Sequence, residues 1–176
     1  ACNHLCHTLC GPAGAICANA VPTAQAAIQI LLEELPVMLA DATVLVIGSG
    51  RIGSSLTRQL RALGCRVCVA SRGAAPGPDR VPTGAYGPVL GQCDAVVNTA
   101  PALVLDAAAL AQTRPDCLIL DLASAPGGVD FDAAAQLGHR ARWELSLPGR
   151  MFPRSAGRII KEAVLRALRT PPRRGG

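Results

Sequence analysis

Three glycines in the segment 43–64 have the type and spacing that a dinucleotide-binding turn needs. Gly48, Gly50 and Gly53 form the pattern GxGxxG. The first glycine permits a tight turn, the second lets backbone approach a phosphate, and the third lets a helix pack close to a strand. The helix start then presents N–H groups and a positive dipole end to the anion. The residues of this predicted cofactor-binding turn are Gly48, Ser49, Gly50, Arg51, Ile52 and Gly53.

The residues on either side of the glycines favour the same interpretation. Because the chain has 18 glycines, the spacing could arise by chance, and a turn without a ligand stays an alternative. However, the apolar run 44–47 comes directly before the turn, and apolar residues recur at helical spacing after it. The order strand, turn and helix therefore supports a pyrophosphate site.

The end of the next predicted strand bears on which dinucleotide is bound. An NAD site usually places Asp or Glu about 20 residues after the glycine turn, where it accepts from the ribose 2′-hydroxyl. No Asp or Glu occurs between Asp41 and Asp79, and the strand ends in Ser71 and Arg72. A hydroxyl and a guanidinium suit a 2′-phosphate. We therefore expect NADP as the cofactor and NAD as the less favoured one, unless Arg72 is merely a surface residue.

Further candidate residues follow the later strands, because ligands of such sheets bind beyond the carboxyl ends of the strands. The predicted cofactor-binding residues there are Asn98, Thr99, Ala100, Pro101, Asp121, Leu122 and Ala123. The predicted substrate-binding residues are Ser124, Gly127, Gly128, Arg154 and Ser155. Arg154 and Ser155 stand at a helix start that could hold a carboxylate. As alternatives, Asp121 could simply bond to nearby backbone N–H groups, and Arg154 could be solvated.

Strands and helices must alternate along the chain to position these residues. The expected strands are residues 44–47, 66–70, 95–98, 117–122 and 140–145, and the expected helices besides the one after the glycine turn are 23–35, 102–112, 131–137 and 155–169. The segment 73–91 is rich in Pro and Gly, so we expect a loop there, with at most a short strand near Tyr86. This alternation predicts an α/β fold, a doubly wound and mostly parallel Rossmann-type sheet with helices on both faces.

Composition and charge limit the domain organisation and the partners. We expect a Cys-rich segment at residues 1–20, an NADP-binding domain at 21–169 and a basic disordered tail at 170–176. No apolar run reaches the roughly 18 residues of a membrane span, so we expect a soluble protein. The net charge of +5 is concentrated at the carboxyl end without interleaved aromatic residues, which argues against nucleic-acid binding.

The eight cysteines form two groups. Four of them lie near His4 and His7, at positions whose spacing matches none of the usual CxxC pairings, so we expect no bound metal. These four are Cys2, Cys6, Cys10 and Cys17. The other four lie in or beside predicted strands, where we expect small buried apolar side chains in a reducing cytosol. They are Cys65, Cys68, Cys93 and Cys117.

Several longer strings resemble the A subunit of dipicolinate synthase. They are DLASAPGGVDF at 121–131, LPGRMFPRSAG at 147–157, NTAPALVL at 98–105 and VPTAQAAIQ at 21–29. The resemblance implies a cytoplasmic enzyme of the mother cell of a sporulating bacterium, which uses NADP to make dipicolinate from 4-hydroxy-tetrahydrodipicolinate. It also implies that the partner is a flavoprotein-like B subunit, and a homo-oligomer stays possible. A dicarboxylate substrate agrees with the anion site expected at Arg154.

Three features depart from this family. Its members carry an additional amino-terminal domain of about a hundred residues, and the chain does not begin with Met, so we expect a fragment or a truncated product. Arg154 stands where the family usually has Lys, which keeps the charge but changes the hydrogen-bond geometry. The Pro-rich segment 73–91 replaces a helical stretch.

Two other functions stay open at this point. One is a non-catalytic dinucleotide-binding module that scaffolds the B subunit. The other is an NAD(P) domain like those of alanine or hydroxyacid dehydrogenases, which usually bring a His with a carboxylate partner near the last strands. His139 is the sole candidate there, and it has no evident partner. Because no His, Lys or Cys stands at a strand end as a general base, we assign no catalytic residue.

Overall fold

The computed structural model describes residues 19–73 and 75–169, and its centre is a parallel sheet. The sheet has six strands in the order β3-β2-β1-β4-β5-β6. The strands are β1 (Thr43–Ile47), β2 (Arg66–Ser71), β3 (Arg80–Pro82), β4 (Ala95–Asn98), β5 (Leu118–Asp121) and β6 (Arg140–Trp143). All of the pairings are parallel. The strand order reverses between β1 and β4, and this topological switch point is where doubly wound sheets bind ligands. The predicted fold class is confirmed.

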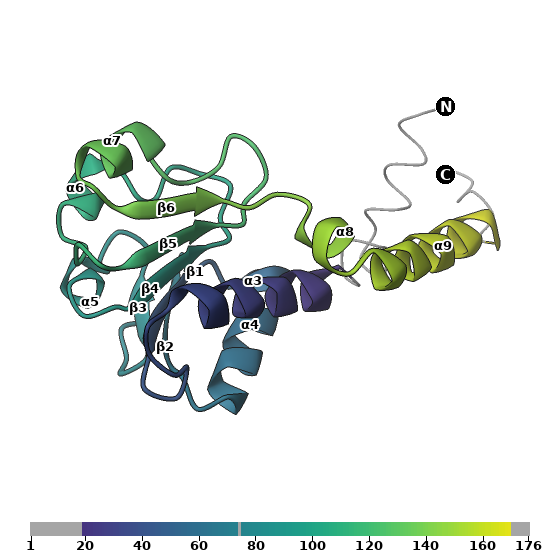
Figure 1. Cartoon of the computed structure of the whole chain (residues 1–176), viewed down its shortest axis with the longest axis horizontal. Helices are drawn as coiled ribbons and strands as arrows, with labels where there is room; N and C mark the ends of the chain where they lie inside the picture. Colours follow the sequence, from purple (N-terminus) through teal and green to yellow (C-terminus); the bar gives the residue numbers. More distant parts are fainter. Residues whose placement is uncertain (1–18, 74, 170–176) are drawn as a thin grey trace.

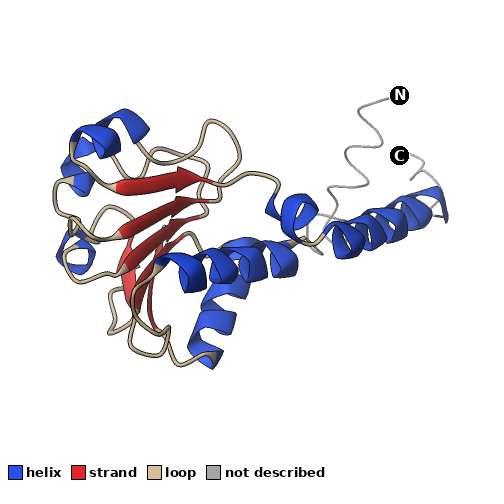
Figure 2. Cartoon of the chain, in the orientation of Figure 1, coloured by secondary structure: helices blue, strands red, loops and turns tan. Residues whose placement is uncertain are grey.

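Helices cover both faces of the sheet (Figure 2). They are α3 (Ala20–Glu34), α4 (Arg51–Ala62), α5 (Gly87–Leu90), α6 (Ala107–Leu110), α7 (Phe131–Gln136), α8 (Leu147–Met151) and α9 (Pro153–Arg169). Figure 1 shows α3 and α4 on one face, α5, α6 and α7 on the other, and α9 extending away from the sheet. No helix among the described residues is long and apolar enough to cross a membrane.

Alternating strand residues build two separate cores. In β1, Val44 and Val46 pack in the cluster beneath α3 and α4, whereas Leu45 and Ile47 pack in the cluster on the opposite face. Successive side chains of a strand point to opposite faces, so a strand with both faces covered must be apolar throughout. This is why the central strands were recognisable as short apolar runs.

Two of the differences from the expected helix ranges have a cause in specific backbone or side-chain contacts. α3 begins at Ala20, and the Thr23 hydroxyl lies inside the helix, where it donates to the Asn19 carbonyl at 2.7 Å. The helix expected at 102–112 is confined to α6, because Leu105 forms a parallel bridge with Val129. Asp106 then caps α6 by accepting from the N–H of Ala109 at 2.9 Å.

The carboxyl-terminal half of the chain and the Pro-rich segment contain elements that the sequence did not reveal. The segment 73–91 is not only a loop: its short strand, β3, lies at Arg80–Pro82 and not near Tyr86, which directly precedes α5. The Tyr86 side chain is buried, and its hydroxyl donates to the Val104 carbonyl. α8 was not among the expected helices.

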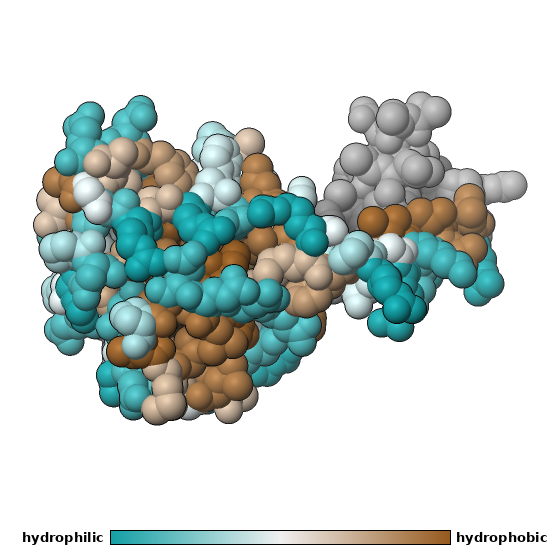
Figure 3. All heavy atoms as spheres, in the orientation of Figure 1, coloured by the Kyte–Doolittle hydropathy of each residue, from teal (hydrophilic) through white to brown (hydrophobic). Residues whose placement is uncertain are grey.

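α9 has an apolar side that the described residues leave exposed. Figure 3 shows brown apolar atoms along one side of this helix and teal polar atoms along the other. Its exposed large apolar residues are Ile160, Val164, Leu165 and Leu168. The Cys-rich segment, apart from residues 19 and 20, and the basic tail lie outside the described residues.

Candidate functional site

The glycine turn brings the end of β1 and the start of α4 into close contact. Gly48 has a φ of +103°, which favours glycine, and its N–H donates to the Ala70 carbonyl at 2.8 Å. A Cβ atom on Gly53 would lie 2.0 Å from the carbonyl oxygen of Gly48. The first glycine therefore makes the turn, and the third permits the packing of helix against strand, as the pattern predicts.

Gly50 has a different environment from these two glycines. It is the N-cap residue of α4, it is exposed, and a Cβ atom added to it would have no atom within 4 Å. No side chain caps α4, and its first turn has no acidic residue. A helix start has N–H groups without intrahelical acceptors and a positive dipole end, so the open space beside Gly50 suits a phosphate.

Hydrogen bonds within the turn fix its backbone. The Ser54 N–H donates to the Gly50 carbonyl at 2.8 Å, and the Ser54 hydroxyl donates to the Ser49 carbonyl at 2.9 Å. Of the other predicted turn residues, Ser49 and Arg51 are exposed and Ile52 is half-buried against the core. The turn is therefore held in shape while its outer surface stays accessible.

The sheet register places the other predicted cofactor residues beside this turn. Ile47 is paired with Ala70 of β2 and with Asn98 of β4, so the segments that follow these strands meet at the carboxyl end of the sheet. The N–H and hydroxyl of Thr99 both donate to the Ile47 carbonyl, at 2.8 and 2.9 Å. Beyond Thr99, the loop after β4 continues with Ala100 and Pro101, which are half-buried and exposed, respectively.

Ser71 is the last residue of β2 and Arg72 follows it, at the same end of the sheet. Ser71 is half-buried and Arg72 is exposed. Within the described part of the chain, Arg72 forms no ion pair. A guanidinium in this position is available for an anionic group of a ligand.

Asn98 and Asp121, at the ends of β4 and β5, lie in the interior of the protein. Both residues are fully buried, with 0% exposure, and they bond to each other: the Asn98 side-chain amide donates to Asp121 Oδ1 at 2.8 Å. Asp121 also accepts from the N–H groups of Ala123 and Gly128, at 2.9 and 2.6 Å. Asp121 thus bonds to nearby backbone N–H groups, as the alternative stated for this residue predicts, and the two side chains hold the loops after β4 and β5.

The loop after β5 is largely occupied by its own hydrogen bonds. Leu122, Ala123, Gly127 and Gly128 are buried, and the Gly127 N–H donates to the Ser124 carbonyl at 2.9 Å. Since the N–H of Gly128 is bonded to Asp121, neither glycine has a free N–H for a substrate. These two glycines shape the loop, and Ser124 is the predicted substrate residue that it exposes.

The remaining predicted substrate residues lie on α9. Arg154 is exposed and Ser155 is half-buried, and both belong to the first turn of α9. Figure 1 shows α9 on the carboxyl side of the sheet but extending away from it. Ser124 thus belongs to the loop after β5, whereas Arg154 and Ser155 belong to a helix that extends away from the sheet.

Sequence reasoning missed two residues that support the site from β6. The indole N–H of Trp143 donates to the Ala123 carbonyl at 2.9 Å, and the ring stacks on Phe131 with centroids 5.9 Å apart. Glu144 is buried, and its carboxylate accepts from Arg142 and Arg150 at 2.6 and 2.7 Å. In the sequence, the only signal for these two residues was an aromatic residue followed by an acid within the last predicted strand, 140–145.

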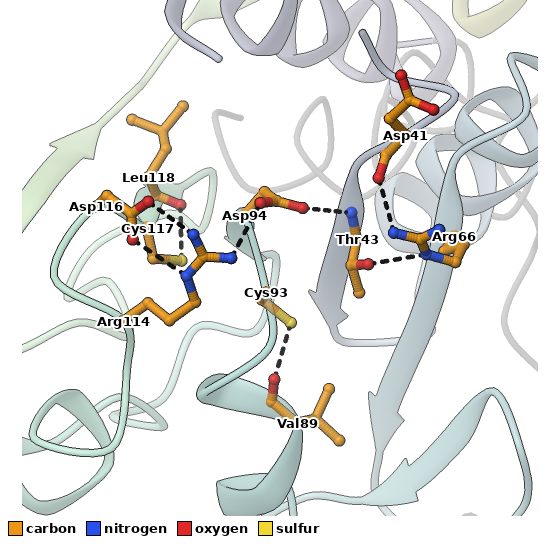
Figure 4. A network of polar contacts seen from close by, with 10 residues as sticks. All are labelled: Asp41, Thr43, Arg66, Val89, Cys93, Asp94, Arg114, Asp116, Cys117 and Leu118. Atoms are coloured by element: carbon orange, nitrogen blue, oxygen red, sulfur yellow. Dashed lines mark hydrogen bonds and ion pairs between the residues drawn. The ribbon is translucent and has the colours of Figure 1, made fainter. Parts of the chain in front are cut away.

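The amino end of the sheet carries a polar network that braces the strands (Figure 4). The Asp94 carboxylate accepts from the N–H of Thr43 at 2.7 Å and pairs with Arg114 at 3.2 Å. Burial raises the pKa of the Cys93 and Cys117 thiols to about 12, so neither thiol is a nucleophile there.

His139 also lies at the amino end of the sheet. It directly precedes β6, and its Nε2 atom is 2.9 Å from the Leu110 carbonyl oxygen. The amino end of the sheet is the end opposite to the glycine turn. His139 is therefore not placed to act on a ligand bound at that turn.

A parallel sheet with this strand order and a GxGxxG turn at its switch point defines a Rossmann-type dinucleotide-binding domain. The sequence agrees with this class. The chain belongs to the family of the NAD binding domain of D-isomer specific 2-hydroxyacid dehydrogenases, which matches residues 26–133.

Comparison with individual proteins shows a more specific similarity, to the A subunit of dipicolinate synthase. The A subunit of dipicolinate synthase from Bacillus subtilis is 32% identical over 157 residues, which cover 85% of this chain and 53% of the relative. The crystal structure of the corresponding protein from Bacillus halodurans has a TM-score of 0.82 and 32% identity, covering 89% of this chain and 56% of that one. For the crystal structure of the Bacillus subtilis protein the TM-score is 0.80, with 31% identity and coverages of 88% and 53%. The predicted resemblance is confirmed, and the chain spans about half the length of these relatives.

Proposed function

We propose that residues 21–169 form an NADP-binding domain that holds the cofactor pyrophosphate at residues 48–53. The observation that carries this proposal is the open space beside Gly50 at the uncapped start of α4. A Cβ atom would meet nothing there, whereas it would collide with neighbouring atoms at Gly48 and Gly53. Of the three glycines, only Gly50, which a phosphate would approach, has open space where a side chain would be.

The position of the nearest acidic residue supports NADP in preference to NAD. Asp79 is the first carboxylate after β2, but its carbonyl accepts from the N–H of Val69, near the middle of that strand. Its carboxylate pairs with Arg61. Asp79 is therefore poorly placed to accept from a ribose 2′-hydroxyl at the strand end, where Ser71 and Arg72 lie instead. A 2′-phosphate would suit those two residues.

The reaction that we propose is the NADP-dependent formation of dipicolinate from 4-hydroxy-tetrahydrodipicolinate during sporulation. The bound nicotinamide would supply the capacity to accept hydride. Ser124 would face the substrate. Arg154 and Ser155 would contact a carboxylate of the substrate only from their position on α9. The partners that we propose are a flavoprotein like the B subunit of dipicolinate synthase and further copies of the chain, in the cytoplasm of the mother cell.

A second function, a dinucleotide-binding module without turnover, is favoured by the absence of a base at the site. Among the described residues, no His, Lys or Cys lies at the carboxyl end of the sheet. His139 lies at the opposite end, and burial raises the pKa of Cys93 and Cys117. Activity assays with substrate and NADP, with and without the B protein, separate the two functions: turnover in either assay supports the enzyme, and none in both supports the module.

Calorimetric titration with NADP and NAD tests the cofactor assignment. We expect a dissociation constant for NADP at least ~10-fold below that for NAD, since a charge-assisted contact contributes about 1.5–3 kcal/mol. Arg72→Ala should weaken NADP binding by about 10–100-fold and leave NAD binding unchanged. Arg58→Ala, at an exposed position of α4, is the matched control and should change neither affinity. Tighter binding of NAD than of NADP would overturn the assignment.

A further inference from the structure

Two buried polar side chains connect the loops that follow β4 and β5. Asn98 and Asp121 stand at the ends of these neighbouring strands and are paired in the sheet register. The Asn98 amide nitrogen donates to Asp121 Oδ1 at 2.8 Å and to the Ala100 carbonyl at 3.0 Å. The Asn98 side-chain oxygen accepts from the N–H of Ala100 at 2.9 Å. Asn98 therefore holds the loop after β4 while it is itself held by Asp121.

The same carboxylate holds the loop after β5. Its Oδ1 atom accepts from the N–H of Ala123, and its Oδ2 atom accepts from the N–H of Gly128. Both ends of the segment 123–128 are thus tied to Asp121. Because these groups are buried, loss of the carboxylate would leave N–H donors without a partner and weaken the hold on both loops.

The two loops also touch directly. A Cβ atom on Gly128 would lie 2.3 Å from the Asn98 amide nitrogen and 2.8 Å from the Ala100 carbonyl oxygen. No side chain fits between the loops at this point, so a displacement of one loop must displace the other. Interiors packed this closely transmit small shifts.

We propose that Asp121 is a positioning residue that joins the loops 98–101 and 122–128 into one unit. A dinucleotide lying against the first loop then orders the second, which exposes Ser124 toward the substrate. This inference rests on the proposed function, because it assigns the first loop to the cofactor. It adds that cofactor binding and the order of the substrate loop are coupled through a side chain that touches neither ligand.

Trp143 provides a reporter for the second loop. It is the only tryptophan of the chain, and its indole N–H donates to the Ala123 carbonyl at 2.9 Å. A Cβ atom on Gly127 would lie 3.3 Å from its ring. Any change in the order of this loop should therefore alter the tryptophan fluorescence.

Amide hydrogen exchange of the ligand-free chain tests the connection itself. Asp121→Asn places an N–H₂ group where the carboxylate accepts hydrogen bonds, so the amides of Ala123 and Gly128 should lose protection at least ~10-fold. The decisive amide is that of Ala100, which bonds to Asn98 and not to Asp121. We expect it to lose protection together with the other two. Unchanged protection at Ala100 would overturn the proposal.

Asp106→Ala is the matched control for this experiment. Asp106 also accepts from a backbone N–H, that of Ala109 at 2.9 Å, but it caps α6. Its removal should expose Ala109 to exchange and leave Ala100, Ala123 and Gly128 protected. If Asp121→Asn does not fold, Asn98→Ala serves instead, and it should lower the protection of Ala123 and Gly128 although their bonds to Asp121 remain possible. Exchange confined to Ala100 in that variant would overturn the proposal.

A fluorescence titration with NADP tests the coupling. The wild-type chain should show a saturable change in Trp143 emission, and Asp121→Asn should bind NADP at least ~10-fold more weakly with a smaller change at saturation. Asp106→Ala should keep both the wild-type affinity and the wild-type change. Equal affinity and an equal change in Asp121→Asn would contradict the coupling. If calorimetry detects no binding to the wild-type chain, the proposed function fails, and the exchange experiment still decides whether Asp121 joins the loops.

Discussion

A Cβ atom on Gly53 would lie 2.0 Å from the carbonyl oxygen of Gly48, so the first turn of α4 is pressed against the end of β1. This contact divides the three glycines of the turn into two kinds. Gly48 and Gly53 are required by the fold, because any side chain there would collide with neighbouring atoms. Gly50 has open space on its outer side and is required only if a ligand fills that space.

Gly53→Ala should therefore destabilise the chain without a ligand being present. We expect a loss of about 1–3 kcal/mol in the free energy of unfolding, because backbone must move to admit the methyl group. Urea denaturation measures this loss. Gly149→Ala, at an exposed glycine whose added Cβ meets nothing within 4 Å, is the control. Equal stability of the two variants would show that α4 is not packed against β1 as described.

Gly50→Val should mainly weaken NADP binding and have only a small effect on stability. Its Cβ atom would meet nothing within 4 Å, but Val is a poorer N-cap residue than Gly, so the free energy of unfolding should fall by about 1 kcal/mol or less. The same side chain would occupy the position of a phosphate, so the affinity for NADP should fall at least ~100-fold. Calorimetry on the folded variant measures this. Wild-type affinity in Gly50→Val would argue against a phosphate beside Gly50.

Gly128→Ala tests the close contact between the loops after β4 and β5. The new methyl group would lie 2.3 Å from the Asn98 amide nitrogen, so we expect a loss of about 1–3 kcal/mol. Gly138→Ala separates collision from backbone strain, because Gly138 has a φ of +76° and no atom within 4 Å of an added Cβ. Its loss should be about 1 kcal/mol, from the strained φ alone. A smaller loss in Gly128→Ala than in Gly138→Ala would contradict the packing.

Glu144→Gln should destabilise the connection between β6 and α8. The carboxylate is 6% exposed and pairs with Arg142 and Arg150, so its replacement removes an ion pair from each, and among the described residues only Arg142 keeps a second carboxylate partner, Glu34 at 2.7 Å. Because both arginines are partly exposed, we expect a loss of about 1–3 kcal/mol rather than the larger loss of a fully buried pair. Glu162→Gln, at an exposed position of α9, should cost less than about 0.5 kcal/mol. Thermal denaturation of both variants provides the comparison.

The buried thiols predict a loss of stability in alkali. Burial raises the pKa of Cys93 and Cys117 from 9.0 to about 12, whereas in the unfolded chain they ionise near the ordinary value. The free energy of unfolding should therefore be constant below about pH 9 and fall as the pH rises toward 12, by about 1 kcal/mol per thiol at pH 10. Denaturation at about pH 8 and pH 10 measures this difference. A Cys93→Ala variant should lose less between the two pH values, and an equal loss would contradict the assignment.

The sequence predicted the strands well because their cause is local. Residues 44–47 of β1 are apolar and Gly48 follows them, so composition alone predicted all of this strand except Thr43. β3 was missed because its three residues lie among Pro and Gly and form a strand only by pairing with β2. α6 was drawn too long because the bridge between Leu105 and Val129 is a long-range contact.

In the site too, features with a local cause were predicted and features that depend on long-range contacts were not. The glycine spacing gave the turn correctly, since each glycine acts on its own backbone. For Asp121 the sequence left two roles open, and it did not reveal the bond to Asn98, because that contact depends on how the loops after two different strands fold. The contribution of Trp143 was missed for a similar reason, since its partner Ala123 follows another strand.

Binding of a dinucleotide at the glycine turn is tested most directly by NMR titration of the 18.0 kDa chain with NADP. The largest changes in amide chemical shift should fall on Gly50, Ile52 and Gly53, with further changes after β2 and β4, and they should be absent in a Gly50→Val variant that remains folded. Saturable shifts that leave residues 48–53 unchanged, or no shifts at millimolar NADP, would contradict a pyrophosphate site at the start of α4.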